Sequence, residues 1–265
     1  MFNFSEMTPE DKQTLIEHLE DFRKALLVSV VAIIVCAFPA FYYSDVLITF
    51  IQLPLVKTHT HLSFTTLFAP FYARLSLSLI AGLIVSFPVV VWQVWKFVAP
   101  ALYPGEKKTI LWVFPIVLIL FVGGVAFGYM VILPAALYFL VVTMGQGLSA
   151  VLTIDDYVSK LIAFTLPFGF LFELPVVVYL LTKLGMVTPA WLSERRKYAL
   201  LIIFIIAAFL TPGPDPVSQC LLGVPIYLLY EISILVSKMV KPSKKPETER
   251  VAAEESESAA SAEEA

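Results

Sequence analysis

Six long apolar blocks, separated by polar or proline-containing segments, dominate this 265-residue chain. A helix needs about 20 consecutive apolar residues to cross a hydrocarbon core ~30 Å thick. Because 59% of the residues are hydrophobic and 15% charged, a soluble domain of this size has no means of burying so much apolar surface. We therefore predict an all-α polytopic membrane protein with six transmembrane helices, at Leu26–Tyr43, Leu75–Trp95, Ile110–Leu133, Val158–Leu181, Tyr198–Leu210 and Val217–Val236.

Lysine and arginine residues gather in alternate connecting segments. They precede the first block, join the second to the third and the fourth to the fifth, and follow the sixth (Lys12, Arg23, Lys24, Lys96, Lys107, Lys108, Lys183, Arg195, Arg196, Lys197, Lys238, Lys241, Lys244, Lys245 and Arg250). The opposite connections are poor in cations, with Lys57 in the first. By the positive-inside rule, both termini are predicted to be cytoplasmic.

The two ends of the chain differ from the six blocks between them. The segment 1–25 has no basic region leading into a short apolar core, so we expect no cleavable signal peptide. The sequence Thr8-Pro9-Glu10-Asp11 predicts a helix start, followed by an amphipathic helix lying along the cytoplasmic interface before it turns into span one. Residues 26–237 form the transmembrane domain, and the acidic segment 238–265 is predicted to be a disordered cytoplasmic tail.

The last two blocks are expected to be short. Tyr198–Leu210 has thirteen residues, or ~20 Å of helix, and the proline-rich turn Thr211–Pro216 cannot continue it. Spans five and six should therefore form a hairpin whose outer end stops below the membrane surface. In the alternative, span five begins earlier and buries the three cations of Arg195–Lys197, which is costly.

Motifs for catalysis or metal binding are absent from the sequence. His59 and His61 are two ligands without a nearby third, which makes a metal site improbable. Cys36 and Cys220 both lie in apolar blocks and are expected to be small buried hydrophobic residues. No nucleophile has a base at a recognisable spacing. We therefore expect neither an enzyme nor a cofactor.

Glu173 is the acid that most needs an explanation, because it lies deep in an apolar block between Pro167 and Pro175. An intramembrane carboxyl is costly and indicates a functional site by default. Lys160 lies near its helix end and can snorkel, whereas Gln219 is expected at a depth close to that of Glu173. One function that this pattern allows is proton-coupled transport of a small solute; another is a purely structural subunit.

A rigid connection on the predicted cytoplasmic side carries a second acid. Glu106 follows Pro100, Pro104 and Gly105, which stiffen the segment and favour a docking surface. A carboxylate in this position can accept two parallel hydrogen bonds from an arginine of a partner, although local pairing with Lys107 and its basic neighbours is the simpler alternative.

Four segments together resemble the TatC family of the twin-arginine protein translocase. In chain order they are His18-Leu-Glu-Asp-Phe-Arg23, Phe97-Val-Ala-Pro-Ala-Leu-Tyr103 with Glu106, Phe172-Glu-Leu-Pro-Val176 and Thr211-Pro-Gly-Pro-Asp-Pro-Val-Ser-Gln219. Each motif alone is weakly specific, but the ordered set is specific and extends from the first helix to the last. The resemblance implies a concave bundle of six helices.

The resemblance also implies a function. Such a protein is a receptor in a bacterial cytoplasmic membrane for folded precursors that carry twin-arginine signal peptides. It self-associates, works with TatA- and TatB-type single-span partners, uses the proton motive force, and needs no cofactor or nucleic acid. Carried over by motif, the signal-peptide-binding residues are Asp21, Arg23, Phe97, Pro100, Leu102, Tyr103 and Glu106. Glu173 and Gln219 would contact a partner's span, and Asp215 would mark the outer turn.

The chain departs from the family pattern at several positions. Asp21 replaces the family's Glu, and Phe22 replaces Leu. Ala25 stands where many relatives have a second arginine, and Gly213 lengthens the outer turn by one residue. The segment between Phe64 and Phe71 lacks an acid that many relatives have. These departures affect the fine geometry of the expected sites.

Overall fold

The computed structural model is helical almost throughout and describes residues 9–58, 62–98, 107–146, 151–210 and 216–240. In chain order its elements are α1 (Pro9–Tyr42), α2 (Ser44–Ile51), η1 (Leu53–Thr58), β1 (Leu62–Ser63), α3 (Ala69–Val98), α4 (Lys107–Phe127), η4 (Gly128–Ile132), α5 (Leu133–Leu137), η5 (Tyr138–Thr143), β2 (Leu152–Thr153), α6 (Ile154–Leu171), α7 (Leu174–Lys183), α8 (Pro189–Glu194), α9 (Arg196–Leu210) and α10 (Pro216–Met239). The strands β1 and β2 pair in parallel, with Leu62 opposite Leu152.

Within the described residues, five helical stretches are long and apolar enough to cross a membrane. They are Leu19–Tyr42, Ala69–Phe97, Val113–Thr143, Ile154–Lys183 and Pro216–Met239, and they coincide with five of the six predicted spans. The remaining predicted span is α9, whose 15 residues extend only ~22 Å. Predicted span six, Val217–Val236, lies within α10, which extends it by one residue at its start and three at its end. With 24 residues, or ~36 Å, α10 is longer than expected, and α9 is the short helix of the two.

The helix is interrupted at the three cations that precede span five. Helix α8 ends at Glu194 and α9 begins at Arg196, and Arg195, Arg196 and Lys197 are all exposed. The single longer helix that the alternative requires, beginning before Arg195 and continuing into span five, is therefore not formed. Thr188 caps α8, since its hydroxyl accepts a hydrogen bond from the Trp191 amide at 3.2 Å.

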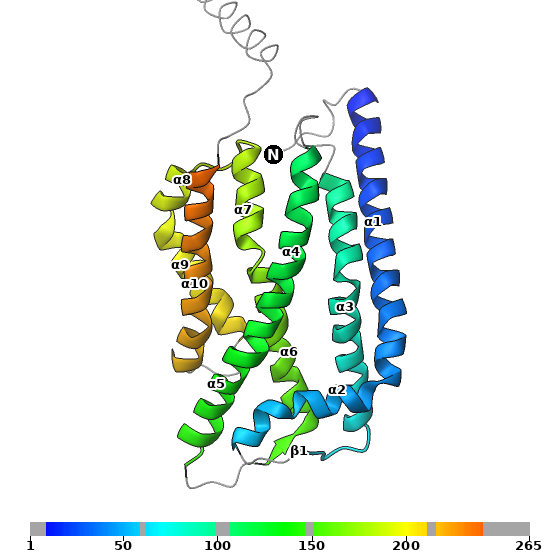
Figure 1. The fold of residues 1–265 in the computed structure, drawn as a ribbon, viewed down its shortest axis with the longest axis vertical. Helices are drawn as coiled ribbons and strands as arrows, with labels where there is room; N and C mark the ends of the chain where they lie inside the picture. The colour runs from blue at the N-terminus through cyan, green and yellow to red at the C-terminus, as the bar shows by residue number, and fades with distance from the viewer. Residues whose placement is uncertain (1–8, 59–61, 99–106, 147–150, 211–215, 241–265) are drawn as a thin grey trace, which may run out of the picture.

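Helix α1 runs without interruption from Pro9 to Tyr42. The predicted start at Pro9 is confirmed, but the predicted turn between the amphipathic segment and span one is absent. Nothing in the sequence between Pro9 and Pro39 breaks a helix, and straight-chain and apolar residues of good helix propensity fill the junction. The interfacial segment and the span therefore form one rod, which stands beside α3 (Figure 1).

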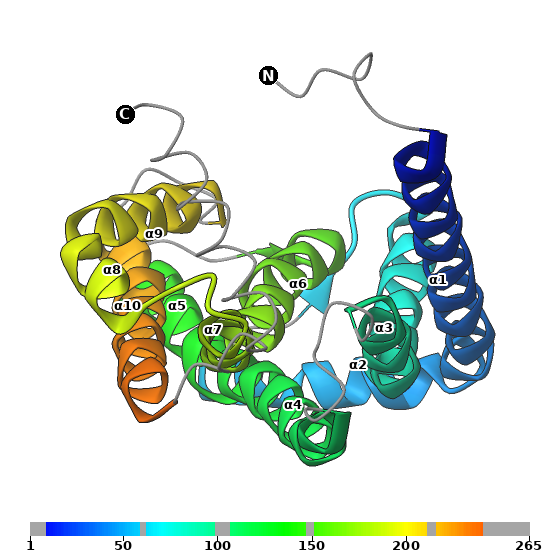
Figure 2. The same ribbon diagram turned by 90° about the horizontal axis from the view of Figure 1, so that it is seen from above.

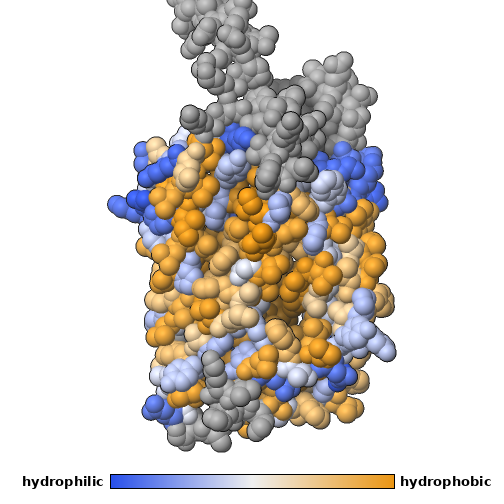
Figure 3. Space-filling view, viewed as in Figure 1, coloured by the Kyte–Doolittle hydropathy of each residue, from blue (hydrophilic) through white to orange (hydrophobic). Residues whose placement is uncertain are grey.

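The helices form a curved row rather than a closed bundle. Seen from above, α1 and α3 lie at one end of the curve and α9 with α10 at the other, with α6 and α7 between them (Figure 2). The first residue of α1 and the last residue of α10 lie at the same end of the molecule (Figure 1). Apolar residues cover the middle of the face seen in Figure 3, with polar residues above and below, as a bilayer requires.

Two sets of buried side chains hold this row together. The larger surrounds α6 and includes Phe164, Phe168 and Leu222; the smaller joins α3, α4 and α7 through Phe87, Phe121 and Val176, among others. Helices α4 and α6 pack with unusually close backbones. A Cβ atom on Gly124 or Gly128 would collide with the backbone of Phe168 or Phe164 respectively, so small residues are required there, as at other close membrane helix crossings.

Helix α2 crosses beneath the bundle at the end opposite the chain termini (Figure 1). Two tyrosines hold its last turn: the Tyr129 hydroxyl donates to the Phe50 carbonyl at 2.5 Å, and the Tyr157 hydroxyl donates to the Ile51 carbonyl. The last carbonyl groups of a helix lack partners within it, so these two bonds satisfy them and fix α2 to the long helices.

Replacing Tyr157 by phenylalanine should destabilise the protein by about 1–3 kcal/mol, because the buried Ile51 carbonyl would lose its partner. Tyr157 is fully buried, so no water can take the place of the hydroxyl. The thermal unfolding of the purified full chain in detergent micelles measures the effect. Tyr138→Phe is the matched control, since Tyr138 is exposed; equal changes in the two variants would contradict the proposed role.

Candidate functional site

A pocket lies between α1 and α3 at the end of the molecule where the chain termini are. It has a volume of about 360 Å³ and is lined by Asp21, Lys24, Ala25, Val28, Gln93, Lys96 and Phe97. The rings of Phe22 and Phe97 lie 5.4 Å apart and join the two helices beside it. The structure therefore brings together Asp21 and Phe97, two of the predicted signal-peptide-binding residues, from segments 76 positions apart in the sequence.

The charges in this pocket are unevenly paired. Lys24 forms an ion pair with Glu20 at 3.5 Å, one helical turn away. Within the described part of the chain, Asp21 and Arg23 form no ion pair, and both are exposed. The predicted role of Arg23 in orienting the surface is thus not accompanied by a contact to Asp21. An unpaired carboxylate in a pocket can bind a guanidinium group from outside.

Several predicted residues lie outside the described ranges. These are Pro100, Leu102, Tyr103, Glu106 and Asp215, together with His59 and His61. The segment 99–106 joins the last residue of α3, Val98, to the first of α4, Lys107, and both of these ends lie at the same end of the molecule as the pocket (Figure 1). In the described part of the chain, no three His, Cys, Asp or Glu side chains are placed to bind a metal ion.

Glu173 occupies a break between two helices. Helix α6 ends at Leu171 and α7 begins at Leu174, with Pro175 in its first turn. Both carboxyl oxygens are shielded from solvent, and neither forms a hydrogen bond with any residue that the structure describes. The backbone of Phe121 lies beside the carboxyl group without meeting hydrogen-bond geometry. A buried carboxyl group without a partner is destabilising, so its retention in the membrane needs another reason.

Aromatic rings and small residues surround this break. The rings of Phe87 and Phe121 stack at 3.4 Å, and Phe170 meets Phe121 edge-on at 5.5 Å. One turn before Glu173, Gly169 lets α6 approach so closely that an added Cβ would touch the Phe121 ring at 2.8 Å. Phe121 therefore connects Glu173 to this aromatic cluster, because its backbone lies beside the carboxyl group and its ring contacts Phe87 and Phe170.

Gln219 is not placed beside a free surface. Its side-chain amide donates to the Phe204 carbonyl of α9 at 2.8 Å, so it joins α10 to the short helix. Lys160 pairs with Asp156 at 3.6 Å, which agrees with a structural role. The cysteines are both free, but Cys220 is exposed rather than buried, since this face of α10 is not covered by another helix.

The sequence analysis overlooked a second acid within the apolar blocks. Glu231 of α10 accepts two hydrogen-bonded contacts from the Arg196 guanidinium, at 2.9 and 3.0 Å, and one from the Tyr227 hydroxyl at 2.9 Å. This group fixes the start of α9 against α10. The signal was present in the sequence, because a single acid in span six and the cations before span five are natural partners across a helical hairpin.

Comparison with known proteins agrees with these features. The family model for the Sec-independent protein translocase protein (TatC) matches residues 17–225. The chain is 43% identical over 234 residues to a protein of that name from Carboxydothermus hydrogenoformans, covering 88% of this chain and 96% of the relative. It is 36% identical to the Escherichia coli K12 protein of the same name over 235 residues, with coverage of 88% and 91%.

A solved structure supports the same assignment. The crystal structure of the twin-arginine translocase receptor TatC superposes with a TM-score of 0.75 at 34% identity, covering 84% of this chain and 98% of that one. The predicted concave helical fold is thereby confirmed, and the transporter alternative is set aside because the family is one of protein translocation rather than of solute transport or catalysis. The chain belongs to the TatC family, the Sec-independent protein translocase proteins.

Proposed function

We propose that this protein is the signal-peptide receptor of a twin-arginine translocase, and that Asp21 and Glu106 bind the paired arginines of the signal peptide. The observation that carries the proposal is the pocket in which Asp21 lies unpaired beside Phe97. The segment that contains Glu106 begins at residue 99, directly after Val98 at the end of α3 and two positions after Phe97. The similar solved structure is named a receptor of the twin-arginine translocase.

The charges of the pocket assign unequal roles to the two acids. Lys24 is neutralised by Glu20, but Lys96 also lines the pocket, so Asp21 alone leaves no net negative charge. Glu106 supplies the missing charge, and two carboxylates can then accept bidentate bonds from two guanidinium groups. Phe97, with Pro100, Leu102 and Tyr103, shapes the apolar surface beside them, and Arg23 orients the carboxylate face.

We further propose that Glu173 contacts the membrane span of a TatA- or TatB-type partner. The observation that supports this is that neither of its two oxygens has a hydrogen-bond partner among the described residues. Gln219 acts in this site by holding α9 in position, since its side-chain amide donates a hydrogen bond to α9. Asp215 marks the outer turn. The protein resides in a bacterial cytoplasmic membrane with both termini in the cytoplasm, self-associates in a larger complex, and uses the proton motive force.

Photocrosslinking from position 97 tests the receptor proposal. With a photoreactive residue in place of Phe97, membranes containing the full chain should form an adduct with an Arg-Arg precursor. A Lys-Lys precursor should give at least ~10-fold less, because lysine lacks the planar fork. Trp92 is the control position, since it is exposed on α3 and does not line the pocket. Equal adducts with both precursors from position 97 would contradict the proposal.

A further inference from the structure

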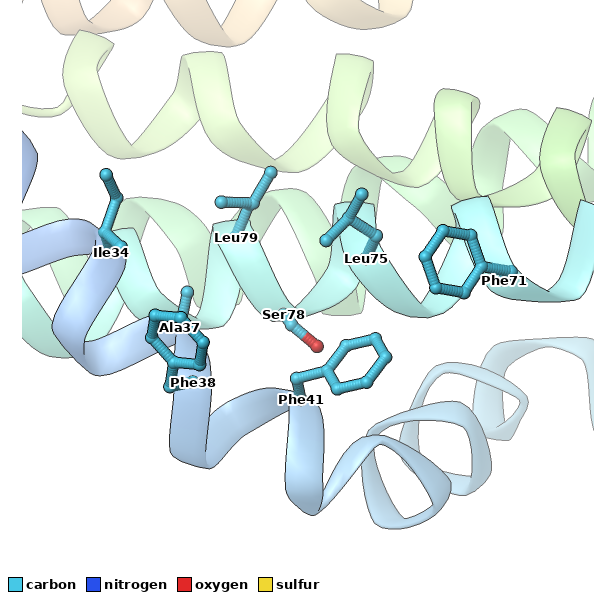
Figure 4. Close-up of a pocket in the computed structure, with 8 residues that line it drawn as sticks. All are labelled: Ile34, Ala37, Phe38, Phe41, Phe71, Leu75, Ser78 and Leu79. Carbon is cyan, nitrogen blue, oxygen red and sulfur yellow. The ribbon is translucent and has the colours of Figure 1, made fainter.

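An apolar groove runs along the contact between α1 and α3 in the half of the molecule nearer α2. Its volume is about 340 Å³, and it is lined by Ile34, Ala37, Phe38, Phe41, Phe71, Leu75, Ser78 and Leu79. Figure 4 shows Ile34 at one end and the two rings of Phe41 and Phe71 at the other. These rings meet edge-on at 6.3 Å. The groove therefore runs parallel to the two helices.

The helix pair is built so that this groove persists. A Cβ atom on Gly82 would lie 2.8 Å from the Ala37 nitrogen and the Ile33 carbonyl oxygen, so α1 and α3 already touch through their backbones and cannot close further. The one hydroxyl in the lining, Ser78, is fully buried and donates to the Arg74 carbonyl of its own helix at 2.7 Å. The walls thus offer hydrocarbon alone.

A charged pair stands just beyond the aromatic end of the groove. The Arg74 guanidinium lies 2.8 Å from the Asp45 carboxylate and donates to the Ser44 hydroxyl at 3.1 Å. Arg74 lies one turn from Ser78 and Phe71 on α3, and Ser44 follows Phe41 by three residues. The Asp45 side chain is 80% exposed and that of Arg74 36% exposed, so both remain open to a ligand.

Exposed aromatic residues indicate the depth of this pair. Tyr42 and Tyr43, at the junction of α1 and α2, are both exposed, and tyrosines of this kind concentrate where membrane meets water. The charged pair therefore lies at head-group level, and the groove extends from there toward the middle of the bilayer. A polar head above a parallel hydrocarbon chain is the layout of a phospholipid.

We propose that the groove binds one acyl chain of a phosphatidylethanolamine from the leaflet next to α2, with its phosphate on Arg74 and its ammonium group on Asp45. Arg74 has N–H groups left after its two bonds, and Asp45 has a free carboxylate face. A paired cation and anion match a zwitterionic head group better than a purely anionic one. The volume, near the lower end of the ~300–1,000 Å³ of ligand pockets, cannot enclose a helix ~10–12 Å across.

Filling the groove tests the acyl-chain site. Leu79→Trp introduces a bulky ring into the wall of the groove, whereas Val85→Trp introduces the same ring at an exposed position on α3 outside the groove. The full chain, purified from membranes in mild detergent, is analysed by native mass spectrometry after addition of phosphatidylethanolamine. Leu79→Trp should retain at least fivefold less lipid than the unaltered protein, and Val85→Trp an unchanged amount. Equal retention in the two variants would overturn the proposal.

The charged pair is tested by lipid choice. The unaltered protein should retain phosphatidylethanolamine in preference to phosphatidylglycerol. Asp45→Asn should remove that preference, because only phosphatidylethanolamine has an ammonium group that the Asp45 carboxylate can bind. A photoreactive group on the acyl chain should label peptides containing Phe38 and Leu75. The site would be refuted if this lipid labelled the exposed length of α1 evenly. It would also be refuted if a photoreactive residue at position 38 captured a protein in place of lipid.

Discussion

The double variant Glu106→Gln, Asp21→Asn should lower the affinity for a twin-arginine signal peptide by more than ~100-fold. A hydrogen bond to a charged group contributes about 1.5–3 kcal/mol, or roughly 10- to 150-fold in affinity for each carboxylate. Glu106→Gln alone should have the larger effect of the two single changes. In the proposed binding mode it removes the charge that outweighs that of Lys96, which lines the pocket, whereas Asp21→Asn leaves the Glu106 carboxylate in place.

Binding of a fluorescent Arg-Arg signal peptide to the full chain in nanodiscs measures these affinities, with a Lys-Lys peptide as the reference for non-specific attraction. Glu194→Gln is the matched control. Glu194 is an exposed acid of α8 that does not line the pocket, so its replacement should change the affinity by less than ~3-fold. An affinity that survives the double change, with the protein still inserted in the membrane, would refute the receptor site.

The sequence was sufficient to predict most of the helical arrangement because the bilayer limits the possibilities. Membrane-length apolar blocks and alternating basic connections require helices that cross back and forth, and the described ends of α1 and α10 do lie at the same end of the molecule. Likewise, Thr188 and Pro189 form the local pattern of a helix start, and α8 begins there. These features depend on local chemistry and on the solvent, both of which a single sequence states directly.

Features that depend on tertiary contacts were harder to predict. The bond from Tyr157 to the Ile51 carbonyl joins segments 106 residues apart, and no local pattern specifies it. The Glu231–Arg196 pair was missed for the same reason, although both charges were visible. The length of α10 was underestimated because a proline-rich turn was taken to shorten the helices on both sides, whereas Pro216 can occupy the first turn of a helix without cost.

In the candidate sites, too, the sequence identified individual residues, whereas their neighbours depend on the folded structure. The motifs named Asp21 and Phe97, and the structure places both in one pocket. Lys24 and Lys96 also line that pocket, and only the packing of α1 on α3 brings them together. Similarly, the sequence singled out Glu173, but the absence of any hydrogen bond to its oxygens could be seen only in the folded protein.

Replacing Glu173 by leucine should make the isolated protein more stable while abolishing its association with a single-span partner. The carboxyl group is buried at membrane depth with no hydrogen bond, and a charged side chain in this setting costs about 2.5–3.5 kcal/mol. Leucine has a similar size and removes that cost, so the free energy of unfolding should rise by up to about 2 kcal/mol, less than the full penalty because water and lipid head groups relieve part of it. A functional residue commonly has this opposed effect on stability and activity.

Glu231→Leu is the matched control, because this second acid of the apolar blocks is bonded to Arg196 and Tyr227. Its replacement leaves Arg196 without a partner and should destabilise the protein, whereas Glu173→Leu should stabilise it. Thermal unfolding of the full chain in detergent measures the first effect. Crosslinking to the partner's span from position 177, which is exposed on α7 one turn from Glu173, measures the second. If Glu173→Leu destabilises the protein as Glu231→Leu does, then the carboxyl group has an internal partner and serves the fold. If the partner still crosslinks at full yield, then its span is bound through other residues. If Glu173→Leu raises the stability and loses the crosslink, while Glu231→Leu lowers the stability and keeps it, then Glu173 is retained for a partner and Glu231 for the hairpin.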